Sequence, residues 1–206
     1  YEQLAQLSLD SDVVYYTDAY GLYNIDWYNK EKPYGVLYGG LSTQDIEFLQ
    51  LMKKKNKPII TEFNVLGEPT NSENRKKFEN LFHIKWTGWS GRYYQNLNQK
   101  SNTELPKWIV NNYEKSNNTK WTFQNEGIIL VKDEQVVVLK IGEELKTPQP
   151  FITSNEKAQS MYNVPEKIDY TFWFDIIEID TNINESNAIY TLDVTKKGKH
   201  LLDTYG

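Results

Sequence analysis

Two carboxylates in this sequence could act together as an acid and a base. Asp18 and Glu62 each stand just after an apolar run that predicts a β-strand. If those strands are parallel neighbours, both side chains lie at the carboxyl edge of the sheet, where ligands of such sheets bind. A carboxylate pair in one cleft can carry out glycoside hydrolysis. The competing interpretation is structural: Asp18 caps a turn and Glu62 pairs with Arg75 or Arg92, because structural ion pairs outnumber catalytic dyads.

The same strand ends supply a candidate ligand site of six side chains. They are Asp18, Glu62, Asn64, Arg75, Trp89 and Arg92. The most distinctive part is WTGWSGRYY, residues 86–94, where glycines allow close backbone approach and indoles offer flat faces to a sugar or an arginine. We give equal weight to the alternative that Trp89 fills the core and Arg92 binds a local carboxylate. Tryptophan is mostly buried, yet it is also enriched at binding surfaces.

Two short motifs predict where helices begin. Ser42 with Asp45, and Thr70 with Glu73, have the spacing of a capping box, in which side chains satisfy the free amides of the first turn. A cap worth about 1 kcal/mol is enough to explain each motif. A ligand role for Thr70 or Asn71 is the less favoured alternative.

Other kinds of catalytic site find little support. The chain has no cysteine, which excludes disulfides, thiolate zinc sites and a cysteine nucleophile. Its histidines are His83 and His200, so a histidine-rich centre is not expected, and we predict no metal and no cofactor. Ser90 does not stand in the GxSxG arrangement of a hydrolase nucleophile. Gly39-Gly40 lacks the spacing of a phosphate-binding loop, so a tight strand-to-helix turn is the favoured explanation.

Composition indicates a globular protein with an acidic balance. The chain has 206 residues, of which 39% are hydrophobic and 14% aromatic, enough to build a core. Its net charge of −5 argues against a nucleic-acid partner. No apolar run approaches the roughly 18 residues that a membrane span needs. We therefore expect membrane contact only through a segment that this sequence does not include.

Strand and helix patterns alternate over the first part of the chain, which is the sign of βαβ units. We predict an α/β fold in which residues 1–120 form a mostly parallel sheet flanked by helices. Residues 121–206 are predicted to form a β-rich portion, packed on the first or continuous with it. Within it, GIILVKDEQVVVLKIG predicts a hairpin. Because the chain opens with a helical pattern, we expect a first strand upstream of Tyr1.

The segment VLYGGLSTQDIEFLQLMKKKNKPIITEFNVLG resembles part of the class I glutamine amidotransferase-like domains. The resemblance covers roughly residues 13–97 and implies their flavodoxin-like fold and a retained pocket. Active members of that family place a cysteine at a nucleophile elbow, with a His-x-Glu pair downstream. Here the elbow position falls near Phe63-Asn64, and both the cysteine and the His-x-Glu pair are missing, so glutamine hydrolysis is excluded. The pattern EFN…PT…R…F…WTGW.GRY also resembles a bacterial family of membrane- or envelope-linked proteins.

These observations favour a noncatalytic, amidotransferase-like ligand-binding or interaction domain of a larger bacterial protein. The expected ligand is a polar small molecule or a glycan, and the expected partners are other domains of a longer chain. One alternative is a carbohydrate-active hydrolase that uses Glu62 and Asp18, and another is a purely structural or assembly module. The resemblance to envelope proteins favours an extracytoplasmic or membrane-anchored location.

Overall fold

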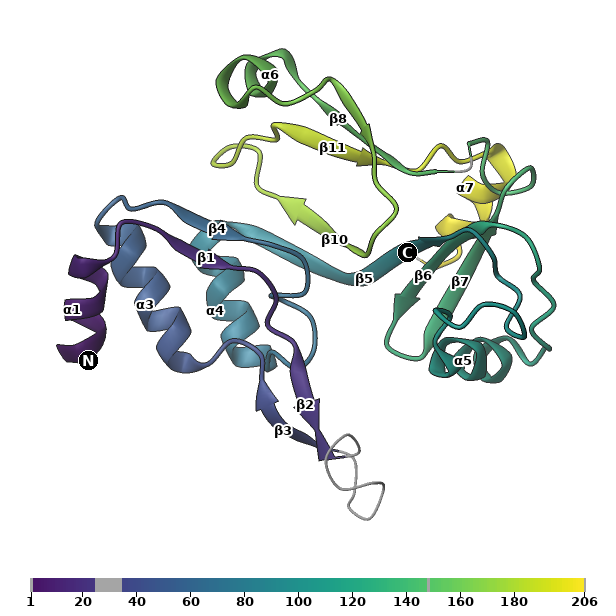
Figure 1. Ribbon diagram of the computed structural model, residues 1–206, viewed down its shortest axis with the longest axis horizontal. Coiled ribbons are helices and arrows are strands. Elements are labelled where there is room, and N and C mark those ends of the chain that lie inside the picture. The colour runs from purple at the N-terminus through teal and green to yellow at the C-terminus, as the bar shows by residue number, and fades with distance from the viewer. Residues whose placement is uncertain (1, 25–34, 148, 206) are drawn as a thin grey trace. The chain divides into compact units, whose positions relative to one another are not determined.

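The structure is a computed structural model that describes residues 2–24, 35–147 and 149–205. It contains two compact units. One comprises Tyr1–Thr87 with Ile177–Asp180, and the other comprises Gly88–Ile176 with Thr181–Gly206 (Figure 1). The predicted boundary at residue 120 separates an α/β portion from a β-rich portion, whereas these two units are defined by their internal contacts. The predicted boundary therefore stays a prediction.

In its described residues, the first unit combines short strands with the helices α1 Glu2–Asp10, α3 Thr43–Lys54 and α4 Ser72–Phe82. Its strands are β1 Val14–Tyr16, β2 Gly21–Tyr23, β3 Val36–Gly39 and β4 Ile59–Thr61. Strands β1 and β4 pair in parallel, with Val14 opposite Ile59. The core beside them is formed by α3, α4 and the loop after β4, and its buried side chains include Ile46, Leu49 and Phe78.

The start of α3 confirms the first predicted capping box. The Ser42 side chain accepts from the Asp45 amide at 3.1 Å, and the Asp45 carboxylate accepts from the Ser42 amide at 2.8 Å. Lys53 and Lys54 stand in the last turn, where cations suit the helix dipole. With both ends stabilised, the buried stripe of Ile46, Leu49 and Met52 can settle against the core.

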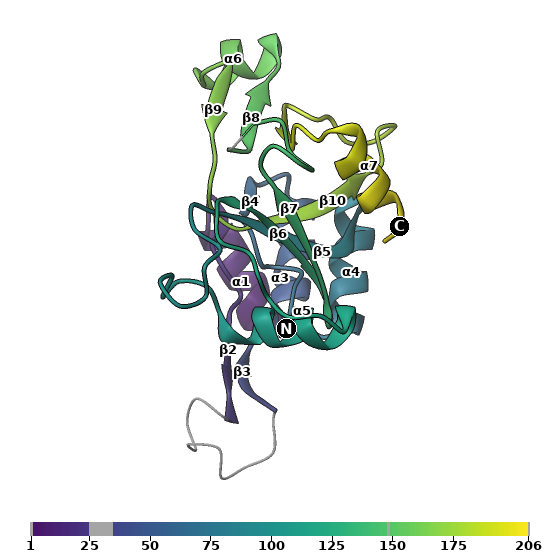
Figure 2. The ribbon, with the colours of Figure 1, turned by 90° about the vertical axis from the view of Figure 1, so that its right-hand side faces the viewer.

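The second unit is built mainly from antiparallel strands. Its elements are β6 Gly127–Lys132, β7 Gln135–Lys140, β8 Phe151–Ser154, β9 Lys167–Asp169, β11 Ala188–Thr191, α5 Lys107–Asn117, α6 Glu156–Tyr162 and α7 Lys196–Asp203. Strands β5 (Ile84–Tyr94) and β10 (Phe174–Ile179) contribute residues to both units. One sheet has the order β10-β5-β6-β7 and another the order β11-β8-β9. Figure 2 shows β9 beside β8.

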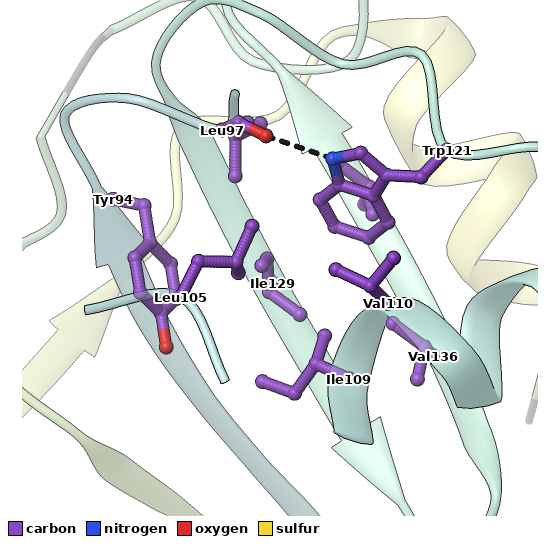
Figure 3. Close-up of a cluster of buried hydrophobic side chains, with 9 residues drawn as sticks. Tyr94, Leu97, Leu105, Ile109, Val110, Trp121, Ile129 and Val136 are labelled. Carbon is purple, nitrogen blue, oxygen red and sulfur yellow. Dashed lines mark hydrogen bonds between the residues drawn. The ribbon is translucent and has the colours of Figure 1, made fainter. Parts of the chain in front are cut away.

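The β6–β7 hairpin is confirmed, and its apolar sequence has a physical cause. Lys132 pairs with Gln135 across a two-residue turn. Side chains alternate between the faces of a strand, so both faces must be covered when every residue is apolar. Ile129 lies in a cluster with side chains of α5, whereas Ile128 and Leu130 lie in a second cluster together with Leu201 of α7. Figure 3 shows the first of these clusters.

The predicted mostly parallel sheet is wrong. Among the described residues, β1 and β4 form the single parallel sheet, while β2–β3, β5–β6, β6–β7 and both pairings of β8 are antiparallel. In the described part of the chain, β3 pairs with β2 and not with β1. Gly39 instead lies opposite Gly21 in a short antiparallel pair. Likewise, β5 turns back into an antiparallel meander, so the alternating pattern of strands and helices does not produce a doubly wound sheet.

Candidate ligand site

The structure brings some of the predicted strand-end side chains together in the first unit. Nδ2 of Asn64 donates to Oδ1 of Asp18 at 3.0 Å, and Asn64 itself adopts a left-handed backbone with φ of 63°. The hydroxyl of Tyr15 donates to the Glu62 carboxylate, and this bond is the main reason why the pKa of Tyr15 is raised. Both carboxylates are exposed to solvent. Glu62 is thus hydrogen-bonded to a tyrosine, whereas the structural alternative had paired it with Arg75 or Arg92.

Arg75 serves the loop that follows β4. Its Nε donates to the carbonyl of Leu66 at 2.6 Å and its Nη2 to the carbonyl of Thr70 at 3.1 Å. The guanidinium also lies over the ring of Trp86, 4.6 Å from the centroid. Two of its donors are thus bonded to backbone carbonyls of the loop, so Arg75 has a structural role in holding the loop.

Thr70 is buried and does not cap α4, because its hydroxyl bonds to backbone groups of two other segments. It is 2% exposed, accepts from the Leu41 amide at 2.9 Å and donates to the Val65 carbonyl at 2.8 Å. The cap of α4 is the next residue, Asn71. Gly40 lies so close that a Cβ added to it would stand 2.6 Å from the Thr70 nitrogen. The diglycine therefore has the structural role expected of a tight turn.

Trp89 and Arg92 belong to the second unit. Trp89 is 7% exposed and lies in a core cluster, edge-on to Tyr205 with 6.1 Å between ring centroids. Nζ of Lys132 stands 5.6 Å from the centre of the Trp89 ring. The position of Trp89 agrees with the alternative in which this side chain fills the core. Of the six predicted residues, Asp18 and Asn64 are hydrogen-bonded to each other. The contacts described for the other four residues are with groups outside this set.

The second unit contains a polar pocket of about 450 Å³, which we call the Arg92 pocket. Arg92 and Tyr94 of β5 line it together with the loop 95–104, and Gln149, Thr171 and Phe172 complete its wall. The guanidinium of Arg92 pairs with Glu104, with 2.5 Å between Nη2 and Oε2. It also lies 4.9 Å from the centre of the Tyr94 ring. A cation, a carboxylate and the aromatic rings of Tyr93, Tyr94 and Phe172 therefore meet with many uncharged polar groups.

Two atoms at this pocket have unused hydrogen-bonding capacity. Nε of Arg92 and the hydroxyl oxygen of Tyr94 are buried, and neither makes a hydrogen bond of normal geometry among the described residues. Burial raises the pKa of Tyr94, whereas the charge of the neighbouring Arg92 and a hydrogen-bonding contact between the two side chains lower it. A buried polar group without a partner costs about 1–3 kcal/mol. Such groups are uncommon in native folds, and each calls for an explanation such as a bound water, an ion or a functional contact.

A chain of asparagines shapes the loop that lines this pocket. Oδ1 of Asn96 accepts from the Asn98 amide at 2.8 Å, and Oδ1 of Asn98 accepts from the Lys100 amide at 3.0 Å. Oδ1 of Asn102 then accepts from the Glu104 amide at 2.9 Å. Asparagine favours such turns because its side chain can bond to the backbone two residues on. Sequence reasoning missed this loop, although the run NLNQKSNTE was the signal that could have found it.

The described residues give no support to a metal centre or to a membrane helix. Among them, no three side chains of the kinds that bind metals are grouped to hold an ion. Within the same part of the chain, no helix is long and apolar enough to cross a membrane. Comparison with protein-family models, with curated proteins and with solved structures found no match.

Exposed apolar side chains of the second unit do not all share one face. Ile189 of β11 is 64% exposed and lies opposite Thr153, whereas Ile168 of β9 is 51% exposed and lies opposite Ile152. Successive residues of a strand point to opposite faces of the sheet. The two isoleucines therefore belong to different faces of the β11-β8-β9 sheet. The alternative of an assembly module stays a prediction.

Proposed function

We propose that this chain is a noncatalytic ligand-binding domain that holds a neutral, hydroxyl-rich ligand such as a glycan fragment in the Arg92 pocket. The proposal keeps the ligand class expected from the sequence and moves the site to the second unit. The domain's place in a larger bacterial envelope protein stays part of the proposal. The observation that carries it is a pair of buried atoms, Arg92 Nε and the Tyr94 hydroxyl, that make no hydrogen bond of normal geometry and belong to residues lining a polar pocket.

The lining of the pocket suits a sugar. Ligand sites combine apolar surface with a few convergent polar groups, and their volumes run from about 300 to 1,000 Å³. Asn96 and Asn102 each use one donor hydrogen and one lone pair within the loop and keep one of each, which matches the hydroxyl groups of a sugar ring. Phe172 is 68% exposed and provides a flat apolar face for the C–H side of such a ring.

The charges at the pocket favour a neutral ligand. Arg92 is already paired with Glu104, so an anionic group would have to displace a carboxylate of this chain. The Glu104 side chain is 68% exposed, whereas that of Arg92 is 24% exposed. Glu104 can therefore swing into solvent and let a ligand hydroxyl approach the guanidinium. An exposed pair of this kind contributes only about 0–1 kcal/mol, so the movement costs little.

Replacing Tyr94 with phenylalanine tests the proposal. Because the hydroxyl makes no hydrogen bond of normal geometry, Tyr94→Phe should leave the free energy of unfolding unchanged or raise it by up to about 1 kcal/mol. The same change should remove a ligand contact and weaken binding roughly five- to tenfold. The measurements are chemical denaturation and NMR titration with glucose, galactose, mannose, xylose and N-acetylglucosamine, read at the amides of the loop 95–104.

The matched control is Tyr190→Phe in the same unit. The Tyr190 hydroxyl donates to the carbonyl of Tyr170 at 3.2 Å, so its loss should lower the free energy of unfolding by about 1 kcal/mol. It should not change the affinity for the sugar. If none of the five sugars perturbs the loop, or if Tyr94→Phe destabilises the fold and binds sugar as the parent chain does, the proposed function is wrong.

A further inference from the structure

We infer that strand β9 joins two copies of this chain into a dimer by pairing, edge to edge, with the same strand of the second copy. This inference goes beyond the proposed function and is independent of it. In the described sheet of order β11-β8-β9, β9 lies at an edge beside β8 (Figure 2). Its residues Lys167, Ile168 and Asp169 are all exposed. An exposed edge is a template on which a strand of another chain can pair.

The backbone of β9 carries hydrogen-bonding groups that face away from β8. The amide of Tyr170 donates to the carbonyl of Pro150 at 3.0 Å, which fixes the phase of the ladder between the two strands. Hydrogen-bonded and non-hydrogen-bonded pairs alternate along an antiparallel ladder. Ile168 therefore bonds to β8, whereas the amides and carbonyls of Lys167 and Asp169 point to the open side. Within the described part of the chain, no hydrogen bond to these outward groups is found.

The opposite edge of this sheet, β11, is less open. The amide of Asn155 donates to the carbonyl of Asn187 at 3.0 Å, so the same alternation turns the backbone of Ala188 away from β8. The carbonyl of Ala188 already accepts from the Ser186 hydroxyl at 3.1 Å. The next outward residue, Tyr190, is partly buried against a core cluster. Of the two edges, β9 is therefore the one that offers free backbone groups to a second copy.

The charges of β9 select one register for this pairing. When a strand pairs with its own copy about a two-fold axis through Ile168, Lys167 lies opposite Asp169 of the second copy, and Asp169 opposite Lys167. Opposite charges directly across an antiparallel pair stabilise it. A two-fold axis through either charged residue would set two lysines or two aspartates opposite each other, which is destabilising. The axis through Ile168 also brings the outward amides and carbonyls of both strands together.

The paired segment is short, so the dimer should be reversible. At the axis, Ile168 meets its own copy as a non-hydrogen-bonded pair, in which side chains approach closely. This side chain is 51% exposed in the single chain, and pairing removes apolar surface from water. Pro165 limits the length of the pairing, because it has no amide to donate and its carbonyl already accepts from the Ser154 hydroxyl at 2.6 Å. Small interfaces of this kind belong to weak complexes.

Exchanging the charges of β9 tests both the dimer and its register. In sedimentation experiments from about 10 μM to about 1 mM, the mass of the parent chain should rise from that of one copy towards that of two. Lys167→Asp sets carboxylates opposite each other and Asp169→Lys sets ammonium groups opposite each other, so each variant alone should dimerise roughly tenfold or more weakly. An equimolar mixture of the two variants restores opposite charges at both positions and should dimerise as the parent chain does. Lys107→Asp, at an exposed position in the first turn of α5, makes the same change of charge and is the control that should dimerise normally.

A single cysteine locates the axis. Because the chain has no cysteine, Ile168→Cys can form a disulfide only with the same residue of a second copy. The Cα separation of a non-hydrogen-bonded pair lies within the range that a disulfide bridges. In a buffer of oxidised and reduced glutathione, Ile168→Cys should cross-link roughly tenfold faster than Ile189→Cys, whose parent side chain on β11 is 64% exposed. The inference is overturned if the parent chain stays monomeric up to about 1 mM, if the mixed charge variants fail to recover dimerisation, or if both cysteines cross-link equally fast.

Discussion

The hydroxyl of Tyr93 donates a hydrogen bond to Oε2 of Glu126, with 2.5 Å between the two oxygens, and so joins strand β5 to the segment before β6. Burial raises the pKa of Tyr93 to about 12, and the bond to Glu126 acts in the same direction. Because Tyr93 also lines the Arg92 pocket, this bond links the stability of the second unit to the geometry of the proposed site.

This raised pKa predicts sensitivity to alkaline pH. In the unfolded chain Tyr93 ionises near pH 10, whereas in the folded chain it stays neutral until about pH 12. Its contribution is therefore complete below about pH 10 and is lost as the pH rises towards 12. We expect the free energy of unfolding to fall over that range, and to fall less in Tyr93→Phe. Equal slopes for both chains in denaturation series from about pH 9 to about pH 11 would contradict the assignment.

Acid should weaken the attachment of α7. Hydrogen bonds from Lys140 and Lys197 lower the pKa of Glu143 to about 2. Its contribution is present above the ordinary value of 4.5 and is lost as the pH falls from there towards 2. In Glu143→Gln, the free energy of unfolding should depend less on pH over this interval. Glu134→Gln, which removes an exposed pair with Lys115, is the control and should retain the dependence of the parent chain.

Removing the charge of Glu104 should change which sugars bind. Glu104→Gln frees the Arg92 guanidinium for an acidic ligand while keeping the size of the side chain. Affinity for glucuronate should rise relative to glucose by roughly tenfold or more, since charge-assisted hydrogen bonds are about twice as strong as neutral ones. Stability should change by less than about 1 kcal/mol because the pair is exposed. An unchanged glucuronate-to-glucose ratio in calorimetry would show that Arg92 does not face the ligand.

Gly40 should tolerate no side chain. Its φ is +73°, and an added Cβ would meet the backbone of Thr70 at 2.6 Å. Gly142 has a similar φ of +79° with nothing within 4 Å, so it is a matched control. Gly142→Ala should cost about 1–2 kcal/mol for the left-handed backbone alone. Gly40→Ala should cost about 1–3 kcal/mol more because of the clash. Equal losses in chemical denaturation would show that the contact is unimportant.

Part of this architecture could be predicted because its causes are local in the sequence. The Ser42–Asp45 capping box depends on groups three residues apart, and the β6–β7 hairpin depends on two apolar runs around a short turn. The second capping motif was misplaced by one residue, because burial draws Thr70 towards Leu41 and leaves Asn71 to cap α4. The ligand class expected from the sequence has become a proposal whose site shares only Arg92 with the six predicted residues.

The sequence by itself determined several of the helices and strands and where two of the tight turns lie, since those choices follow from neighbouring residues. Only the tertiary structure decided which strands pair and in which direction, and that Trp89 is enclosed by the core. It alone revealed the Arg92 pocket and the buried hydroxyl of Tyr94. The physical reason is that strand pairing and burial depend on contacts between distant residues, whereas capping and hydrophobic periodicity are expressed within a few residues.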